Sequence, residues 1–98
     1  MTMPIVFSRP AQADYKEAIA WYERQRSGLG DRFRERLQEA LDRIAATPEM
    51  HQFIFKDVRR TPVQGFPYSV IYRVKSKKIR VLAVFHGRRD PTVWQMRD

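Results

Sequence analysis

Apolar residues recur with a helical period through the first half of the chain. A short apolar run at 5–7, between Pro4 and Ser8, comes first and predicts an edge strand. Ser8 can cap a following helix, which we expect to end near Ser27 and Gly28. Its apolar face repeats every three or four residues: Ala11, Tyr15, Ala18, Ile19 and Tyr22.

A second helical stripe begins around Gly30 and Asp31 and ends before Pro48. Its apolar positions are Leu29, Phe33, Leu37, Ala40, Leu41 and Ile44. Because a short link between helices makes them antiparallel neighbours, the two stripes predict a helical hairpin.

The period changes to that of strands in the second half. Residues 52–55 and 58–62 indicate one bent strand or two short ones, whereas 68–74 and 79–86 are clear strands joined by the polar turn 75–78. Together the elements predict an α+β fold in β-α-α-β-β-β order. The helical hairpin would lie on one face of a mostly antiparallel sheet, in a single domain spanning 1–98.

The turn fixes the expected pairing of the two clear strands. It places these residues opposite one another on an apolar face: Val74 and Ile79, Tyr72 and Val81, Val70 and Ala83, Tyr68 and Phe85. The other face then carries Ser69 opposite Val84, Ile71 opposite Leu82 and Arg73 opposite Arg80, with His86 at its far end. Such a mixed apolar and basic face, if exposed, could dock an acidic amphipathic segment or a nucleic-acid backbone.

Length and charge limit the number of domains and indicate the class of binding partner. The chain has 98 residues, the size of one small domain, and a formal charge of +8 that is concentrated in residues 49–98. This charge predicts a polyanionic or acidic protein partner. Cysteine is absent, and no apolar run is long enough for a membrane span or arranged as a signal peptide. We therefore expect a soluble cytoplasmic protein that does not contact membranes.

Basic residues suggest two sites for anions. Arg73 opposite Arg80 is an unfavourable pair unless an acid lies between them, although both side chains could simply extend into water. His86 precedes Arg88, Arg89 and Asp90, and this group could bind phosphate or carboxylate and move a proton. Alternatively, His86 hydrogen-bonds the backbone and Asp90 pairs with a neighbouring arginine.

The tryptophans and the remaining histidine are further candidates. Trp21 lies beside the first helical stripe and packs between the helices or contacts a partner, whereas Trp94 could fold back as a lid over the core. Arg97 would enlarge the basic surface, and His51 is expected to be a solvated loop residue. No metal-ligand spacing, phosphate loop or activated serine is present, so we expect no metal and no cofactor.

Long segments of the chain resemble the RelE/ParE superfamily of type II toxin-antitoxin toxins, also called plasmid stabilisation proteins. The resemblance covers nearly the whole chain. It rests on WYERQRSGLGDRFRERLQEALDRIAATP at 21–48, FPYSVIYRV at 66–74 and VLAVFHGRRDPTVWQMR at 81–97. It implies the same β-α-α-β-β-β fold and a cognate antitoxin whose disordered, acidic and amphipathic C-terminal segment folds on the toxin. Operator DNA would then be bound only indirectly, through the antitoxin.

The resemblance implies two possible activities. ParE-type toxins poison DNA gyrase by binding, whereas RelE-type toxins cut mRNA on the ribosome through attack of a 2′-hydroxyl on the adjacent phosphate. RelE-type sites use lysines and a tyrosine near the C-terminus, and neither follows the last predicted strand here. We therefore favour a non-enzymatic gyrase inhibitor, with RNA cleavage as the alternative and a non-toxic interaction module as a second alternative.

Each activity selects its own candidate residues. Under the RelE interpretation, the candidates for RNA cleavage are Arg60, Arg73, Arg80, His86 and Arg89, with Tyr68 or Lys56 for proton transfer. The candidates for binding a target or the antitoxin are Trp21, Ile71, Arg73, Arg80, Leu82, His86, Arg88, Arg89, Trp94 and Arg97.

Overall fold

The computed structural model describes residues 3–97, which form two long helices, five strands and a short C-terminal helix. In chain order these are β1 (Ile5–Phe7), α1 (Arg9–Gln25), α2 (Leu29–Ala46), β2 (Gln52–Phe55), β3 (Val58–Val63), β4 (Tyr68–Lys75), β5 (Lys78–His86) and α3 (Thr92–Gln95). The predicted α+β fold is confirmed. The stretch expected to form one bent strand or two short ones forms two, and α3 is an addition.

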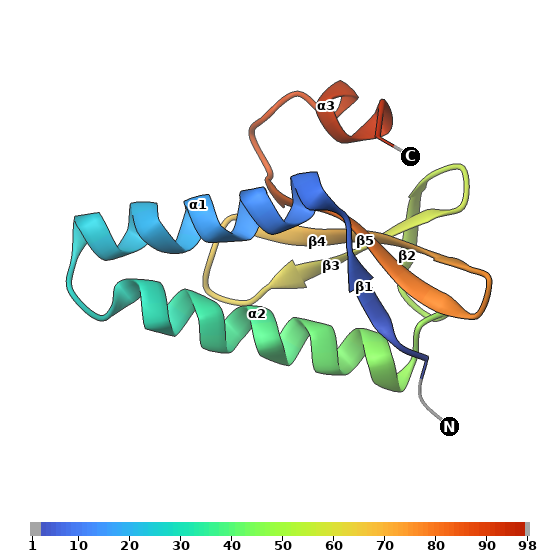
Figure 1. Ribbon diagram of the computed structural model, residues 1–98, viewed down its shortest axis with the longest axis horizontal. Helices are drawn as coiled ribbons and strands as arrows, with labels where there is room; N and C mark the ends of the chain where they lie inside the picture. The colour runs from blue at the N-terminus through green and yellow to red at the C-terminus, as the bar shows by residue number, and fades with distance from the viewer. Residues whose placement is uncertain (1–2, 98) are drawn as a thin grey trace.

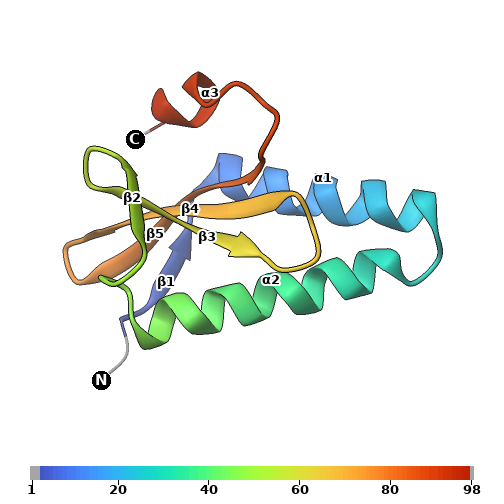
Figure 2. The same cartoon turned by 180° about the vertical axis from the view of Figure 1, so that it is seen from behind.

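The strands form one sheet in the order β1-β5-β4-β3-β2. β1 lies at the edge as predicted and is parallel to β5, whereas the other neighbours are antiparallel. α1 packs on β5 and α2 on β3, so the helical hairpin covers one face of the sheet (Figures 1 and 2). Within residues 3–97, no helix has the length and apolar character needed to cross a membrane.

The ends of the two helices are fixed by local hydrogen bonds. Ser8 caps α1 as predicted, because its Oγ accepts from the Ala11 N–H at 3.2 Å. Between the helices, the Glu23 carboxylate accepts from the N–H groups of Gly28 and Gly30 at 3.0 Å each. These hydrogen bonds lower the pKa of Glu23, the one from Gly28 most strongly. The Glu23 carboxylate therefore stabilises the tight turn of the hairpin.

Two apolar cores lie on opposite faces of the sheet. The core under the helices joins Phe33 and Ile44 to the sheet residues Val70, Tyr72 and Val81, all of them fully buried. The core on the far face contains Val58, Ile71, Leu82, Ala83, Phe85 and Trp94. The sheet is thus buried on both sides, and its far face is covered by the C-terminal segment.

A β-bulge between β4 and β5 changes the predicted pairing. Near the turn, Val74 faces Ile79, Arg73 faces Arg80 and Tyr72 faces Val81, as expected. Leu82 is then an extra residue, so Ile71 faces Ala83 and Tyr68 faces His86. The other expected pairs are therefore wrong: Val70 with Ala83, Tyr68 with Phe85, Ile71 with Leu82 and Ser69 with Val84. Phe85 moves to the far face, and His86 moves to the face of the helices.

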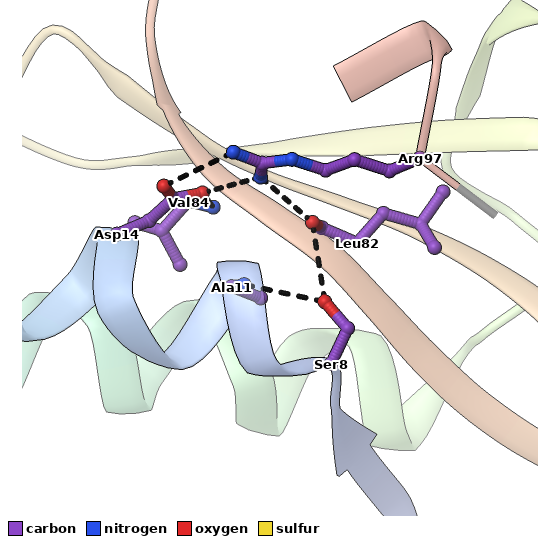
Figure 3. A network of polar contacts seen from close by, with 6 residues as sticks. All are labelled: Ser8, Ala11, Asp14, Leu82, Val84 and Arg97. Carbon is purple, nitrogen blue, oxygen red and sulfur yellow. Dashed lines mark hydrogen bonds and ion pairs between the residues drawn. The ribbon is translucent and has the colours of Figure 1, made fainter. Parts of the chain in front are cut away.

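The outer edge of β5 continues beyond the end of β1 and is covered by side chains instead of a strand (Figure 3). Asp14 Oδ2 accepts from the Val84 N–H at 3.1 Å, and Arg97 Nη1 donates to the Leu82 carbonyl at 3.0 Å. Arg97 Nη1 also lies 2.7 Å from Asp14 Oδ2, and Ser8 Oγ donates to the Leu82 carbonyl. We call the Asp14–Arg97 pair the clasp. It satisfies backbone groups that would otherwise be unpaired at this edge.

Arg97 was expected to enlarge the basic surface, and this prediction is wrong. Its side chain is 19% exposed and is bound to Asp14. The guanidinium is needed at the unpaired edge of β5, so its charge is neutralised inside the fold.

Candidate binding grooves at the end of the sheet

The predicted binding residues are divided among separate places. Trp21, His86, Arg88 and Arg89 border a groove of about 650 Å³ between α1 and the loop after β5. We call it the end groove. Its full lining is Asp14, Glu17, Ala18, Trp21, Tyr22, Pro67, Tyr68, Val84, His86, Arg88 and Arg89. Sequence analysis missed Asp14, Glu17 and Tyr22, which belong to a helix that the chain folds across the end of β5.

His86 is held in a defined orientation at this groove. Its ring lies edge-on to Tyr68, with centroids 5.2 Å apart, and its Nδ1 accepts from the Arg88 N–H at 3.0 Å. The neutral imidazole therefore carries its proton on Nε2. The expected backbone hydrogen bond of His86 is confirmed. Asp90 instead accepts from the Thr92 N–H at 3.0 Å, so its expected pairing with an arginine is wrong.

The tyrosines that line the end groove are kept neutral. Burial raises the pKa of Tyr22, and the neighbouring Tyr68 adds to this effect. Burial also raises the pKa of Tyr68; Arg89 opposes the increase, and Glu17 and Asp14 reinforce it. The charges on both sides of the groove therefore affect the pKa of the Tyr68 hydroxyl. Both phenols can donate hydrogen bonds at neutral pH.

Trp21 lies at the rim of the end groove, with 48% of its surface exposed. It contacts the Tyr22 ring edge-on at a centroid distance of 5.0 Å. Of the two placements expected for Trp21, packing between the helices is wrong and the exposed position is confirmed, whereas contact with a partner stays a prediction.

The two arginines at the hairpin tip lie away from His86, because Arg80 is near the start of β5 and His86 is its last residue. Arg73 Nη2 pairs with Asp57 Oδ1 at 3.2 Å, and Arg80 is exposed beside it. The acid that this like-charge pair requires is therefore supplied by the chain itself.

A second groove, of about 350 Å³, lies on the far face of the sheet. We call it the far-face groove; its lining is Gln52, Ile54, Arg60, Ser69, Ile71, Phe85, Gly87, Arg89, Pro91, Trp94 and Gln95. Arg89 borders both this groove and the end groove. Arg60 and Arg89 are thus brought to one groove, without His86.

The expected exposure of Ile71 and Leu82 is wrong, because their side chains are 3% and 2% exposed. Trp94 covers this face as the predicted lid; it is 4% exposed and meets the Phe55 ring edge-on. Lys56 lies over the same Phe55 ring, 5.2 Å from its centroid.

His51 is half-buried, so its prediction as a solvated loop residue is also wrong. Its ring lies against Tyr72, and its Nε2 is 3.3 Å from Thr47 Oγ1. The end of α2 and the start of β2 enclose it.

A third groove, of about 800 Å³, follows the outer side of the helical hairpin. We call it the helix groove; its apolar lining is Phe7, Tyr15, Ile19, Ala20, Leu37 and Leu41. Four of these positions belong to the predicted apolar stripes of the helices. Leu37 and Leu41 are buried in the core as well as lining the groove, whereas Tyr15 and Ile19 are only partly buried. Within residues 3–97, no three His, Cys, Asp or Glu side chains come together to hold a metal ion.

Comparison with known proteins identifies the family. The sequence of residues 5–91 matches the protein family described as the ParE toxin of the type II toxin-antitoxin system parDE. The chain belongs to the ParE toxin family. This match spans the helical hairpin and the sheet and ends within the loop that carries Arg88 and Arg89. No curated protein matches the chain in sequence.

Solved structures share the fold of this ParE-family chain at low sequence identity. The chromosomal ParDE system from P. aeruginosa aligns with a TM-score of 0.65 and 19% identity, over 86% of this chain and 95% of that chain. The isolated E. coli RelE toxin aligns with a TM-score of 0.65 and 16% identity, over 95% of this chain and 93% of that toxin. An E. coli RelE mutant in complex with a RelB antitoxin peptide aligns with a TM-score of 0.64 and 17% identity, over 97% of this chain and 93% of that chain. The scaffold is therefore common to toxins named for both branches of the superfamily.

Proposed function

We propose that this ParE-family chain is the toxin of a toxin-antitoxin module in the cytoplasm and that it inhibits DNA gyrase by binding. The observation that carries the proposal is the separation of the candidates for RNA cleavage. His86 lines the end groove with Arg89 and Tyr68, whereas Arg60 faces the far-face groove and Arg73 and Arg80 lie at the hairpin tip. Three of the four candidate arginines therefore lie away from His86. General acid-base cleavage needs these groups around one phosphate. Inhibition by binding does not.

The loop after β5 is the proposed contact with gyrase. Arg88 and Arg89 are exposed there, on the strand end that carries His86. Their charges are available to an acidic surface of the target, whereas those of Arg73 and Arg97 are paired with Asp57 and Asp14. Because exposed charges accelerate association between complementary surfaces, this loop is the best-placed docking element.

The helix groove is the proposed site of the antitoxin. Its polar and apolar rim matches an amphipathic segment, whose apolar side would contact Tyr15, Ile19, Leu37 and Leu41. The similar RelE structure contains an antitoxin peptide, which supports a peptide partner for this fold. The far face does not offer such a site, since Trp94 already covers it.

Induced expression of the chain alone tests the proposed target. DNA synthesis and protein synthesis are followed separately by pulse labelling in the first minutes. We expect DNA synthesis to stop while translation continues. An early stop in translation would contradict gyrase inhibition, and normal growth would favour a non-toxic interaction module.

One observation favours RNA cleavage as a second candidate function. Arg60 and Arg89 share the far-face groove with Ser69, and two guanidinium groups can hold a phosphate. If this groove cleaves mRNA, Arg60→Ala combined with Arg89→Ala should abolish transcript cleavage and restore translation. Unchanged cleavage in the double variant would exclude the groove as the catalytic site.

A further inference from the structure

The end groove has a chemical organisation that gyrase inhibition does not require. Along α1, Asp14, Glu17 and Trp21 follow one another at intervals of about one turn and border the groove from the same side. Opposite them, the loop after β5 contributes Arg88 and Arg89. The groove is therefore acidic along the helix and basic along the loop.

The acidic side presents one available carboxylate. Asp14 is bound to Arg97 at 2.7 Å and to the Val84 N–H at 3.1 Å, so its charge is neutralised within the fold. Glu17 forms no ion pair with any residue of 3–97, yet its charge acts on the Tyr68 hydroxyl. The exposed Glu17 carboxylate lies one helical turn before Trp21. Together they offer an acceptor of two hydrogen bonds beside an aromatic ring.

The aromatic surface of Trp21 is available to a planar ligand. Phe53, another exposed aromatic residue, carries the Arg59 guanidinium 3.7 Å from its ring centroid. Trp21 instead contacts Tyr22 and remains half exposed at the groove. The rings of Tyr68 and His86 continue the aromatic surface into the groove. A planar base can stack on such a surface, and base–aromatic stacking contributes about 1–3 kcal/mol.

We propose that the end groove binds a guanine nucleotide. The base stacks at Trp21, its N1–H and 2-amino group donate to the Glu17 carboxylate, and its phosphate is held by Arg88 and Arg89. A groove of about 650 Å³ lies within the size range of small-molecule sites. The ligand is either a free nucleotide or the 5′-phosphorylated end of a strand, since both present the same base and phosphate.

Other ligands of similar size satisfy fewer of these groups. Inorganic phosphate uses the arginines and leaves Trp21 and Glu17 without partners. Adenine places its N1 acceptor where guanine has a donor, so it faces the Glu17 carboxylate with one donor and one repulsive lone pair. The groove should therefore distinguish the two purines through Glu17. A site built for a hydrogen-bonded pair rejects an analogue that leaves a polar group unpaired.

The test is isothermal titration calorimetry, which measures the affinity of the purified full chain for 5′-GMP, 5′-AMP and guanosine at physiological salt. We expect 5′-GMP to bind about tenfold more tightly than 5′-AMP. Trp21→Ala should weaken 5′-GMP binding about tenfold, and Trp21→Phe should restore most of it, because a smaller ring still stacks. Glu17→Gln should remove the preference for 5′-GMP over 5′-AMP.

The phosphate contact has its own variant and a matched control. Arg88→Ala with Arg89→Ala should reduce 5′-GMP binding to the level of guanosine. Arg24→Ala with Arg26→Ala removes the same charge outside the groove and should leave 5′-GMP binding unchanged. Equal losses in the two double variants would reduce the effect to net charge and overturn the site.

Two further results test whether the site exists and which ligand it binds. Absence of 5′-GMP binding at millimolar concentration, or full binding by Trp21→Ala, overturns the proposal. Tighter binding of 5′-GMP than of a 5′-phosphorylated tetranucleotide beginning with guanine assigns the free nucleotide, and tighter binding of the tetranucleotide assigns the strand end. These measurements record binding and not gyrase activity, so they succeed or fail separately from the proposed toxin function.

Discussion

Replacing Asp14 with alanine should destabilise the fold far more than the loss of an exposed surface charge. The Asp14 carboxylate accepts from Val84 N–H and from both terminal nitrogens of Arg97. The side chains of Asp14 and Arg97 are 11% and 19% exposed, so neither is well solvated when its partner is removed. The substitution leaves the Arg97 charge without its carboxylate partner, although Nη1 still donates to the Leu82 carbonyl, and it leaves the Val84 N–H without an acceptor.

The size of the loss follows from these contacts. Breaking a buried ion pair by removing one partner costs about 3–5 kcal/mol of unfolding free energy. Because Arg97 is partly exposed, we expect Asp14→Ala to cost about 3 kcal/mol, the lower end of this range. Asp14→Asn keeps an acceptor for the Val84 N–H, so about half of this loss is expected. Arg97→Ala should cost about 2 kcal/mol, since the Leu82 carbonyl still accepts from Ser8.

Urea unfolding, followed by circular dichroism at pH 7, measures these free energies. A double-mutant cycle of Asp14→Ala and Arg97→Ala should give a coupling energy of about 1 kcal/mol or more. Glu39→Ala is the control; it breaks the more exposed Arg36–Glu39 pair and should cost less than about 0.5 kcal/mol. If Asp14→Ala costs no more than this control, or if the cycle is additive, the clasp does not hold the edge of β5.

Three further predictions concern the core. Burial raises the pKa of Tyr72 from 10.0 to about 12, so the neutral phenol, which donates to the Pro48 carbonyl, stabilises the fold. The free energy of unfolding should therefore fall as the pH rises from about 10 to 12, and Tyr72→Phe should flatten that part of the curve; an unchanged curve would contradict this. Gly30→Ala would place a Cβ 2.8 Å from the Ile19 carbonyl oxygen and should cost about 1–2 kcal/mol in urea unfolding. Trp94→Ala should cost about 3 kcal/mol and increase binding of an apolar dye at the uncovered far face; unaltered dye binding would contradict the role of Trp94 as a lid.

Local sequence signals predicted most of the fold. The stripes of α1 and α2, the cap at Ser8 and the stop at Pro48 each act over a few residues, so they can be recognised without knowledge of the tertiary structure. The pairing of Val74 with Ile79 was predictable for the same reason, because the adjoining turn sets it.

The bulge at Leu82 could not be predicted from alternation. Residues 81–85 are all apolar, so they carry no period-2 signal that would show where one residue is added. The faces of Phe85 and His86 depend on this added residue, which explains why both were expected on the wrong side of the sheet. The clasp was equally hidden, because Asp14 and Arg97 are 83 residues apart in the chain.

The candidate site was predicted only in its local part. His86, Arg88 and Arg89 are neighbours in sequence, and the structure places all of them at the end groove. Trp21 joins them because α1 lies across the end of β5. Glu17 could not be predicted, since one acidic residue on a charged helix has no distinguishing pattern in the sequence.

A supercoiling assay with purified gyrase and the purified chain tests the central claim most directly. We expect supercoiling to be lost as the chain approaches the concentration of gyrase. Arg88→Ala with Arg89→Ala should relieve this inhibition at least about tenfold, the loss expected when interface charges are removed, whereas Arg24→Ala with Arg26→Ala should inhibit like the natural chain. Full gyrase activity in the presence of excess natural chain would contradict the account.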